Sequence, residues 1–328
     1  MEVVLPNGEV MRTGMGALPG NNTWQLFQYG YGPYCDGIFS QSNYGICTKM
    51  GVWLMPPPEG YQVFLFTFPR EEDLHQLVEI IRPLRIANVI ANVPHVRHAL
   101  EECAVQGTRR EWCPEVVGAV PDDVLEKMTE KLWMGKCRWL YYGCVYGPEA
   151  FRKAQLEVIK DAFFQIKGAK LFFPEDSPPN SYLRSRVNIY TGTPDLRELD
   201  WVNWRTNGGH IAFSPVSPVR GQDAVKQFAL CKKICDKYGF DFLSTYCVGM
   251  REMHHIAEII FDKADPDGKR KVLQCCRELI AEAAKLGYGE YRTHLILQDQ
   301  VAATYNWNNN VRNVVRWKLI LIDFDEVQ

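Results

Sequence analysis

The chain has 328 residues, which is enough for about two domains of roughly 150 residues each. Its 37 lysines and arginines nearly balance its 39 aspartates and glutamates, which leaves a formal net charge of −2. This balance excludes a protein whose main task is to grip nucleic acid or an anionic membrane, because both need a basic surface. With 46% hydrophobic and 23% charged residues, the composition is that of a soluble globular protein.

The first 58 residues are rich in glycine and turn signals and show no convincing helix. Leu5–Val10 is typical of a hairpin, because its Asn-Gly pair supplies the positive φ angles of a tight turn. Phe39–Thr48 is a polar, glycine-containing turn before a strand, and it can offer backbone N–H groups to a phosphate or an adenine ring. Thr13–Gly16 is too short for a dinucleotide fingerprint, which excludes a Rossmann fold.

Pro56-Pro57-Pro58 predicts a stiff extended linker and a domain boundary, after which strands alternate with helices. Strands are expected over residues 61–68, 138–146, 170–173, 210–215, 240–248 and 254–261. Helices are expected over 71–84, between Pro148 and Gly168, over 222–238, and over 272–286, where Asp265–Gly268 forms the preceding turn.

Helical spacing predicts which faces of two of these helices are buried. We expect an inward stripe of Phe151, Ala154, Val158, Ala162 and Ile166 in one helix and of Val225, Phe228, Ala229 and Cys235 in the other. The units 138–173 and 210–248 have similar lengths, which predicts an internal duplication. Helices that connect strands indicate a layered sheet covered on one face.

The eleven cysteines are scattered, without a Cys-x-x-Cys pair, so neither a disulfide framework nor a zinc site is expected. Free thiols indicate a reducing compartment. The N-terminus lacks the features of a signal peptide, and no stretch reaches about 18 apolar residues. We expect a soluble cytoplasmic or peroxisomal protein, although the C-terminus has no peroxisomal tripeptide.

His254 and His255, with Glu252 and Glu258 nearby, form the one local cluster that could bind a metal. In a strand, however, adjacent histidines point to opposite faces and cannot share an ion, so we expect no metal site. Arg251 lies at the end of an apolar strand, where its guanidinium needs an anionic or carbonyl partner. A structural ion pair with Glu252 and a role in a site both remain open.

Several strings of residues, taken in order, resemble the vanillyl-alcohol oxidase and 4-cresol dehydrogenase family of FAD-linked oxidases. In the first 58 residues they are Arg12–Leu18, Gly30–Tyr34, Asp36-Gly37, Ser40–Asn43, Gly45-Ile46 and Trp53–Pro56. Further on they are Ile81–Arg85, Pro174–Asp176, Val248–His255, Gly289–His294 and Thr304–Asn309. An ordered series that covers nearly the whole chain is more specific than any single motif.

The resemblance implies an α+β fold. Residues 1–58 would be the C-terminal part of a PCMH-type FAD-binding domain, and residues 59–310 a cap domain with an antiparallel sheet covered by helices. Residues 311–328 no longer follow the family and are expected to be a divergent tail. Because family members are longer at the front, the chain is expected to be a fragment that lacks the N-terminal part of the flavin domain and the native C-terminus.

The resemblance also implies FAD-dependent oxidation of para-substituted phenols by hydride transfer to flavin N5, in an enzyme of the aryl-alcohol oxidase type. His294 matches the position that carries a covalent FAD, and the backbone of Ser42, Gly45 and Ile46 would lie against the cofactor. A histidine at that position favours the oxidases, which use dioxygen as the acceptor, over the cytochrome-linked cresol dehydrogenases. Arg251 is the candidate substrate residue.

No catalytic residue is assigned by the resemblance. It places a phenol-binding tyrosine and an acidic residue before the start of this chain, and a phenolate-holding Tyr-Arg pair after Asn310, where the match has ended. The chain alone is therefore expected to bind FAD poorly and to turn over slowly or not at all. A catalytically inactive cap-domain remnant and a cresol-dehydrogenase-type enzyme are the alternatives. The expected partners are a phenolic substrate and further copies of the chain, without nucleic acid or membrane.

Overall fold

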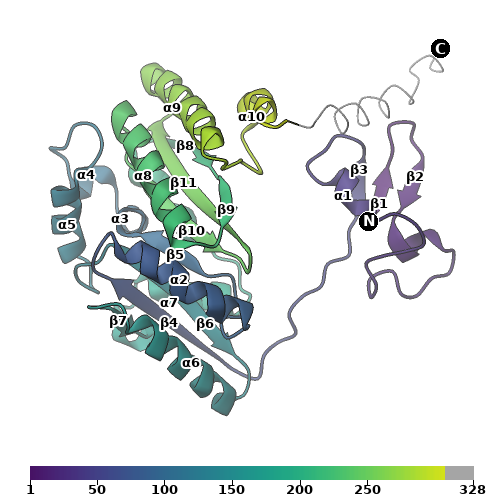
Figure 1. Cartoon of the computed structure of the whole chain (residues 1–328), viewed down its shortest axis with the longest axis horizontal. Coiled ribbons are helices and arrows are strands. Elements are labelled where there is room, and N and C mark those ends of the chain that lie inside the picture. Colours follow the sequence, from purple (N-terminus) through teal and green to yellow (C-terminus); the bar gives the residue numbers. More distant parts are fainter. Residues whose placement is uncertain (307–328) are drawn as a thin grey trace. The chain divides into compact units, whose positions relative to one another are not determined.

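The computed structural model describes residues 1–306, which divide into two compact units, Met1–Pro58 and a second unit that begins at Glu59 (Figure 1). The first unit holds a small antiparallel sheet in which β1 (Glu2–Val4) lies between β2 (Val10–Arg12) and β3 (Ile46–Lys49). The predicted hairpin between β1 and β2 is confirmed, and Gly8 supplies the positive φ of its turn, at 84°. Two short helices, η1 (Gly14–Ala17) and α1 (Asp36–Phe39), complete the regular structure described in this unit.

The second unit is built on an eight-stranded antiparallel sheet. Its order is β7-β4-β6-β5-β10-β11-β8, and β9 pairs with β11 beyond this path. The strands are β4 (Tyr61–Phe68), β5 (His95–His98), β6 (Trp139–Tyr146), β7 (Lys170–Phe172), β8 (Gly208–Phe213), β9 (Val216–Pro218), β10 (Leu243–Val248) and β11 (Glu252–Asp262).

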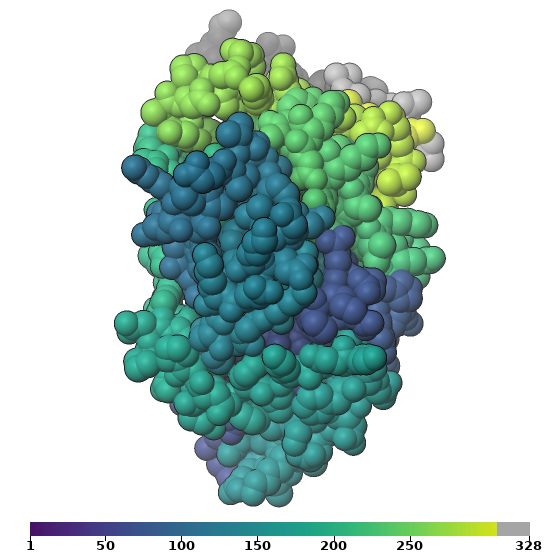
Figure 2. Space-filling model, turned by 90° about the vertical axis from the view of Figure 1, so that its left-hand side faces the viewer, coloured from purple at the N-terminus to yellow at the C-terminus, as the bar shows by residue number. Residues whose placement is uncertain are grey.

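Helices cover both faces of this sheet, so the expectation of one covered face was wrong (Figure 1). Figure 2 shows one side of this unit, where the segment between β5 and β6 forms the blue surface in front. One face carries α2 (Asp73–Ile86), α6 (Glu149–Phe163), α8 (Gly221–Tyr238) and α9 (Pro266–Lys285). The other carries α3 (Ala99–Gln106), α5 (Asp122–Glu130), α7 (Tyr182–Tyr190) and η3 (Arg197–Trp204). The continuous buried run over 63–68 in β4 is typical of a strand with apolar neighbours on both faces.

The remaining short helices are α4 (Arg109–Trp112), η2 (Pro174–Asp176), η4 (Leu295–Leu297) and α10 (Gln298–Thr304). No helix within residues 1–306 is long and apolar enough to cross a membrane. Asp265–Gly268 is the start of α9 and not a separate turn, because the Asp265 side chain caps the helix by accepting from the Asp267 N–H at 2.9 Å.

The topology repeats, but not between the two segments that the sequence suggested. β4-α2-β5-β6-α6 and β8-α8-β10-β11-α9 follow the same path, since in each repeat the third strand lies between the first two. The repeats meet where β5 pairs with β10. In the predicted unit 138–173, the strand between β6 and β7 is the earlier β4, so this unit is not equivalent to 210–248. Similar lengths of strand and helix carry no information about pairing order.

The buried face of α6 was also predicted wrongly, although Ile166 of the expected stripe, just after the end of the helix, is fully buried. Phe151 and Val158 are 56% and 46% exposed, whereas Ile159 and Phe163 are fully buried. The Phe163 ring packs edge-on against Phe66, with centroids 4.9 Å apart. In α8, likewise, Phe228 and Cys235 face the core as expected but Val225 and Ala229 do not. Apolar residues recur on two adjacent helical stripes, and only contact with the sheet decides which stripe is buried.

Candidate functional site

A cleft of about 490 Å³ lies in the second unit, where β10 and β11 meet. The turn between these strands, residues 249–251, supplies part of its wall, and the two strands supply another part. The lining residues are Arg85, Val93, Cys247, Gly249, Met250, Arg251, Glu252, His254, Ile256 and Tyr291. A volume of this size is in the range of small-molecule sites.

Antiparallel register decides which side chains of β10 and β11 reach the cleft. Cys247 is the partner of His254, and because side chains alternate along a strand, both project to the same face as Ile256. His255 projects to the opposite face, where it is buried, and its Nε2 lies 2.8 Å from the Ser244 hydroxyl. The two adjacent histidines are therefore separated by the sheet and cannot share a metal ion.

Arg251 is an exposed member of the cleft lining. Its guanidinium makes no salt bridge with Glu252 or with any other carboxylate among residues 1–306. The backbone carbonyl, in contrast, accepts from the Val219 N–H at 3.4 Å and holds the turn. The structural ion pair considered from the sequence is not formed, so this cation faces the cleft without a partner from the described chain.

Tyr291 reaches the same cleft from the segment that follows α9. Its ring packs edge-on against the His254 ring, with centroids 4.6 Å apart and planes at 79°. The guanidinium of the next residue, Arg292, lies 6.0 Å from the centre of the Tyr291 ring. Tyr291 thus lines the cleft, and the adjacent Arg292 lies beside its ring. The sequence analysis expected a Tyr-Arg pair after Asn310, which lies outside the described residues, and did not single out Tyr291 and Arg292, although both lie within the matching string Gly289–His294.

Two further titratable side chains lie on this side of the sheet, on β8 and β11. His210 Nε2 is 3.9 Å from Glu258 Oε2, and the imidazole packs against the Trp201 ring at 5.0 Å. Burial lowers the pKa of His210, which favours its neutral form. Burial, with a smaller contribution from Glu101, raises the pKa of Glu258 to about 8. The sequence analysis did not pair His210 with Glu258, because β8 and β11 are far apart along the chain.

A network of buried charges lies beside this pair and the cleft. Arg97 on β5 binds Glu101 at 3.2 Å and Glu198 at 2.9 Å, and Arg186 binds the other oxygen of Glu198 at 3.0 Å. The Thr245 hydroxyl donates to Glu101 and ties the network to β10. Since every member is paired, we interpret this network as a structural support for the central strands.

His294 is exposed and is not part of the cleft lining. Its Nδ1 accepts from the Ile296 N–H at 3.2 Å and caps η4, which leaves Nε2 as the nitrogen outside this cap. The other sequence-predicted cofactor residues lie in the first unit. Ser42 is exposed, and its hydroxyl donates to the Ile38 carbonyl at 2.6 Å.

Gly45 and Ile46 lead from that turn into β3. A Cβ on Gly45 would lie 2.4 Å from Cγ1 of the buried Val3, so only glycine allows the turn to approach β1 this closely. Ile46 pairs with Val4 in the sheet, yet it is 72% exposed. The turn therefore presents backbone and apolar surface that the residues of its own unit do not cover.

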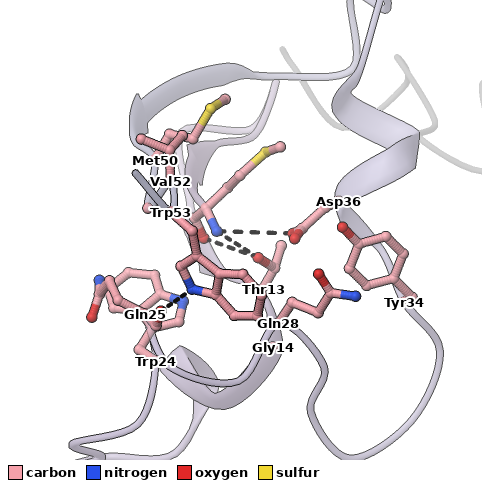
Figure 3. Close-up of a pocket in the computed structure, with 12 residues that line it drawn as sticks. Thr13, Gly14, Trp24, Gln25, Gln28, Tyr34, Asp36, Met50, Val52 and Trp53 are labelled. Atoms are coloured by element: carbon pink, nitrogen blue, oxygen red, sulfur yellow. Dashed lines mark hydrogen bonds and ion pairs between the residues drawn. The ribbon is translucent and has the colours of Figure 1, made fainter. Parts of the chain in front are cut away.

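The first unit also has a pocket of about 320 Å³, which is drawn in Figure 3. Aromatic and polar residues line it: Met1, Thr13, Gly14, Trp24, Gln25, Gln28, Tyr34, Asp36, Met50, Gly51, Val52 and Trp53. The Trp53 indole N–H donates to the Gln25 carbonyl at 2.6 Å, which orients one wall. Ser42, Gly45 and Ile46 are not in this lining, so the pocket and the predicted cofactor turn are distinct features.

Comparison with known proteins identifies relatives along almost the whole chain. The chain is 39% identical over 306 residues to the 4-cresol dehydrogenase [hydroxylating] flavoprotein subunit of Pseudomonas putida, which covers 93% of this chain and 58% of that protein. It is 25% identical over 337 residues to 1'-carboxy-chondrochloren decarboxylase of Chondromyces crocatus, with 92% and 62% covered. No family model matches the chain.

Solved structures agree with these relatives. The 4-ethylphenol oxidase of Gulosibacter chungangensis in an isoeugenol complex matches with a TM-score of 0.92 at 38% identity, over 97% of this chain and 62% of that one. The p-cresol methylhydroxylase with substrate bound matches with a TM-score of 0.89 at 38% identity, over 93% and 59%. The chain thus spans about 60% of the length of these relatives. By sequence and by α+β fold, the chain is a homologue of the 4-cresol dehydrogenase flavoprotein subunit and of 4-ethylphenol oxidase, in agreement with the family that its motifs resemble.

Proposed function

We propose that the chain takes part in the FAD-dependent oxidation of para-substituted phenols, with the cleft of the second unit as the phenol site. Relatives of the chain are named for 4-cresol and 4-ethylphenol, which are both para-substituted phenols. The observation that carries the proposal is the cleft itself, in which Tyr291, Arg251 and His254 surround a space of about 490 Å³.

The polar residues of this cleft suit a phenol that must ionise. A free phenol has a pKa of about 10, like that of tyrosine, so the phenolate needs a nearby cation to form at neutral pH. Arg251 offers a guanidinium without a carboxylate partner in the described chain, and Arg292 adds a second cation beside Tyr291. The Tyr291 hydroxyl is a hydrogen-bond donor for the same oxygen.

FAD, when bound, accepts a hydride from the substrate carbon at its N5 atom. We propose that the Ser42–Ile46 turn contacts the cofactor through its backbone. The close packing of Gly45 on Val3 and the exposure of Ser42 and Ile46 support this, because together they leave a turn that presents its backbone outward.

A histidine is proposed to hold the flavin covalently, and two residues are candidates. His294 follows from the family resemblance, and its Nε2 remains available outside the η4 cap. The observations that support His210 are chemical: the lowered pKa keeps its imidazole neutral and nucleophilic, and Glu258 lies 3.9 Å away as an acceptor for the proton that attachment releases. His294 has no comparable neighbouring carboxylate among residues 1–306.

We further propose an oxidase that uses dioxygen as its acceptor and that assembles into homo-oligomers. A cresol-dehydrogenase-type enzyme with another acceptor and a catalytically inactive cap-domain remnant are the alternatives. The test is to purify the 328-residue chain with added FAD and to follow oxygen uptake with 4-cresol and 4-ethylphenol. Oxygen uptake with both phenols supports the oxidase. Flavin reduction by 4-cresol without oxygen uptake supports the dehydrogenase type, and a folded chain that binds neither FAD nor 4-nitrophenol supports the remnant.

A further inference from the structure

The segment that carries Tyr291 is tied to the sheet immediately before that residue. The Gly289 carbonyl accepts from the Val216 N–H at 2.9 Å, and the Glu290 side chain accepts from the Ser214 N–H at 3.2 Å. A further hydrogen bond runs from the Tyr305 hydroxyl to the Glu290 carbonyl, at 3.0 Å. Tyr291 is therefore the first residue beyond a firmly held piece of backbone.

These hydrogen bonds connect the segment before Tyr291 to β11, the strand that lines the cleft. Glu290 and Pro215 form an isolated antiparallel bridge, and the Pro215 carbonyl accepts from the His255 N–H at 3.1 Å. His255 is the neighbour of His254, whose ring contacts Tyr291. The short path from Glu290 through Pro215 thus ends on the strand that supplies the His254 side of the cleft.

Glu290 is a carboxylic acid in a buried position, and burying a carboxyl group costs solvation free energy. It is 5% exposed, and its Oε2 lacks a well-oriented hydrogen bond within residues 1–306. Burial raises the pKa of this carboxyl to about 7. A buried carboxyl needs hydrogen-bond partners, and this one has the Ser214 N–H, which bonds to Oε1 just after the end of β8, and the Thr293 side chain.

We propose that Glu290 is a positioning residue of the phenol site: by binding the Ser214 backbone it holds Tyr291 against His254 in the cleft. The inference rests on the proposed function, which makes this cleft the phenol site. Glu290 is not itself part of the lining, so it acts only through Tyr291. It should therefore govern phenol affinity and leave the chemical step nearly unchanged.

Three substitutions at position 290 separate the effect of side-chain length from the effect of side-chain charge. E290A removes the acceptor and leaves the Ser214 N–H without its partner. E290Q keeps a carbonyl oxygen at the same distance along the side chain, without the charge. E290D keeps the charge on a side chain one methylene shorter, which withdraws the acceptor from Ser214. The matched control is Q155A, which removes another buried side chain with one hydrogen bond to a backbone carbonyl, 3.1 Å from Val89 O and outside the cleft lining.

The experiment measures binding of 4-nitrophenol to the full chain in the presence of FAD, from the absorbance of the bound phenolate. This probe reports on the cleft whether or not the protein turns over. We expect E290A and E290D to weaken binding about tenfold, the cost of one lost buried hydrogen bond. E290Q and Q155A should bind like the wild type, and in a protein that turns over 4-cresol the E290A change should appear in KM and not in kcat.

Each result decides the question. Wild-type affinity in E290A overturns the inference and leaves the phenol site standing. If E290A fails to fold, as judged by circular dichroism, the other two variants decide. Weak binding of 4-nitrophenol by E290D with normal binding by E290Q supports the inference, because the length of the side chain and not its charge then matters. Normal binding by E290D with weak binding by E290Q overturns the inference. A wild-type chain that does not bind 4-nitrophenol overturns the phenol site itself, and the inference with it.

Discussion

His210 and Glu258 lie diagonally across the β8–β11 pairing, in which His210 is the register partner of Ile260, and the imidazole Nε2 is 3.9 Å from the carboxyl Oε2. The two side chains come from strands that are separated in sequence by two strands and a helix, β9, α8 and β10. Each has a pKa shifted by burial toward its uncharged form. A neutral imidazole can act as a nucleophile toward the flavin, and a neighbouring carboxyl that ionises with pH can accept the proton that attachment releases.

If His210 is the attachment residue, His210→Ala should abolish covalent flavin while His294→Ala retains it. The measurement is flavin fluorescence of the protein band after denaturing electrophoresis of FAD-loaded samples. Each variant serves as the control for the other, since both side chains are at least partly exposed and their loss should change stability little. Loss of covalent flavin in His294→Ala alone would instead support the assignment made from the family resemblance.

The rate of flavin attachment should rise with pH through about 8. Because burial and Glu101 raise the pKa of Glu258 to about 8, its carboxyl is mainly protonated at pH 7 and becomes a proton acceptor only as the pH increases. Arg292 opposes this shift, so Arg292→Gln should move the midpoint to higher pH. Glu258→Gln should slow attachment and flatten the profile. A wild-type rate that is independent of pH between 6 and 9 would exclude Glu258 as the acceptor.

Arg251→Met should weaken phenol binding at neutral pH. Without the guanidinium, the phenolate must form without that cation, so the optimum of kcat/KM for 4-cresol should move to higher pH. A loss of about tenfold in kcat/KM at pH 7 is expected for one lost charge-assisted hydrogen bond. Arg110→Met, at an exposed arginine of α4 outside the cleft, is the matched control. An unchanged pH optimum in Arg251→Met would remove Arg251 from the site.

The two aromatic residues of α6 should respond oppositely to truncation. Phe163 is fully buried against Phe66 and Tyr141, so Phe163→Ala should lower the free energy of unfolding by about 3–5 kcal/mol. Phe151 is 56% exposed, so Phe151→Ala should change it by less than about 0.5 kcal/mol. Urea unfolding followed by circular dichroism measures both. Equal losses would mean that the orientation of α6 is wrong.

Local chemistry made much of the element order predictable. The strand 61–68 has the predicted bounds because a run of apolar residues begins and ends there, and α8 ends where Gly239 adopts a left-handed φ of 76°. The opposite directions of His254 and His255 also follow from strand geometry alone. Each of these features depends on residues within a few positions of one another.

Features that depend on pairing between distant segments were not predictable in this way. The buried stripe of α6, the second helical layer and the true equivalence of the two repeats all depend on how strands are ordered in the sheet. The same applies to Tyr291, which the sequence analysis placed only within the matching string Gly289–His294 and which lines the cleft in the structure.

The family resemblance, the α+β class and the positions of most strands and helices could be predicted from the residues alone, because ordered motifs and local periodicity depend on short stretches of the chain. The common cleft of Arg251, His254 and Tyr291 and the contact between His210 and Glu258 became evident from the three-dimensional fold. The physical reason is that antiparallel register and the fold of the segment after α9 bring together side chains whose separation along the chain says nothing about their distance in space.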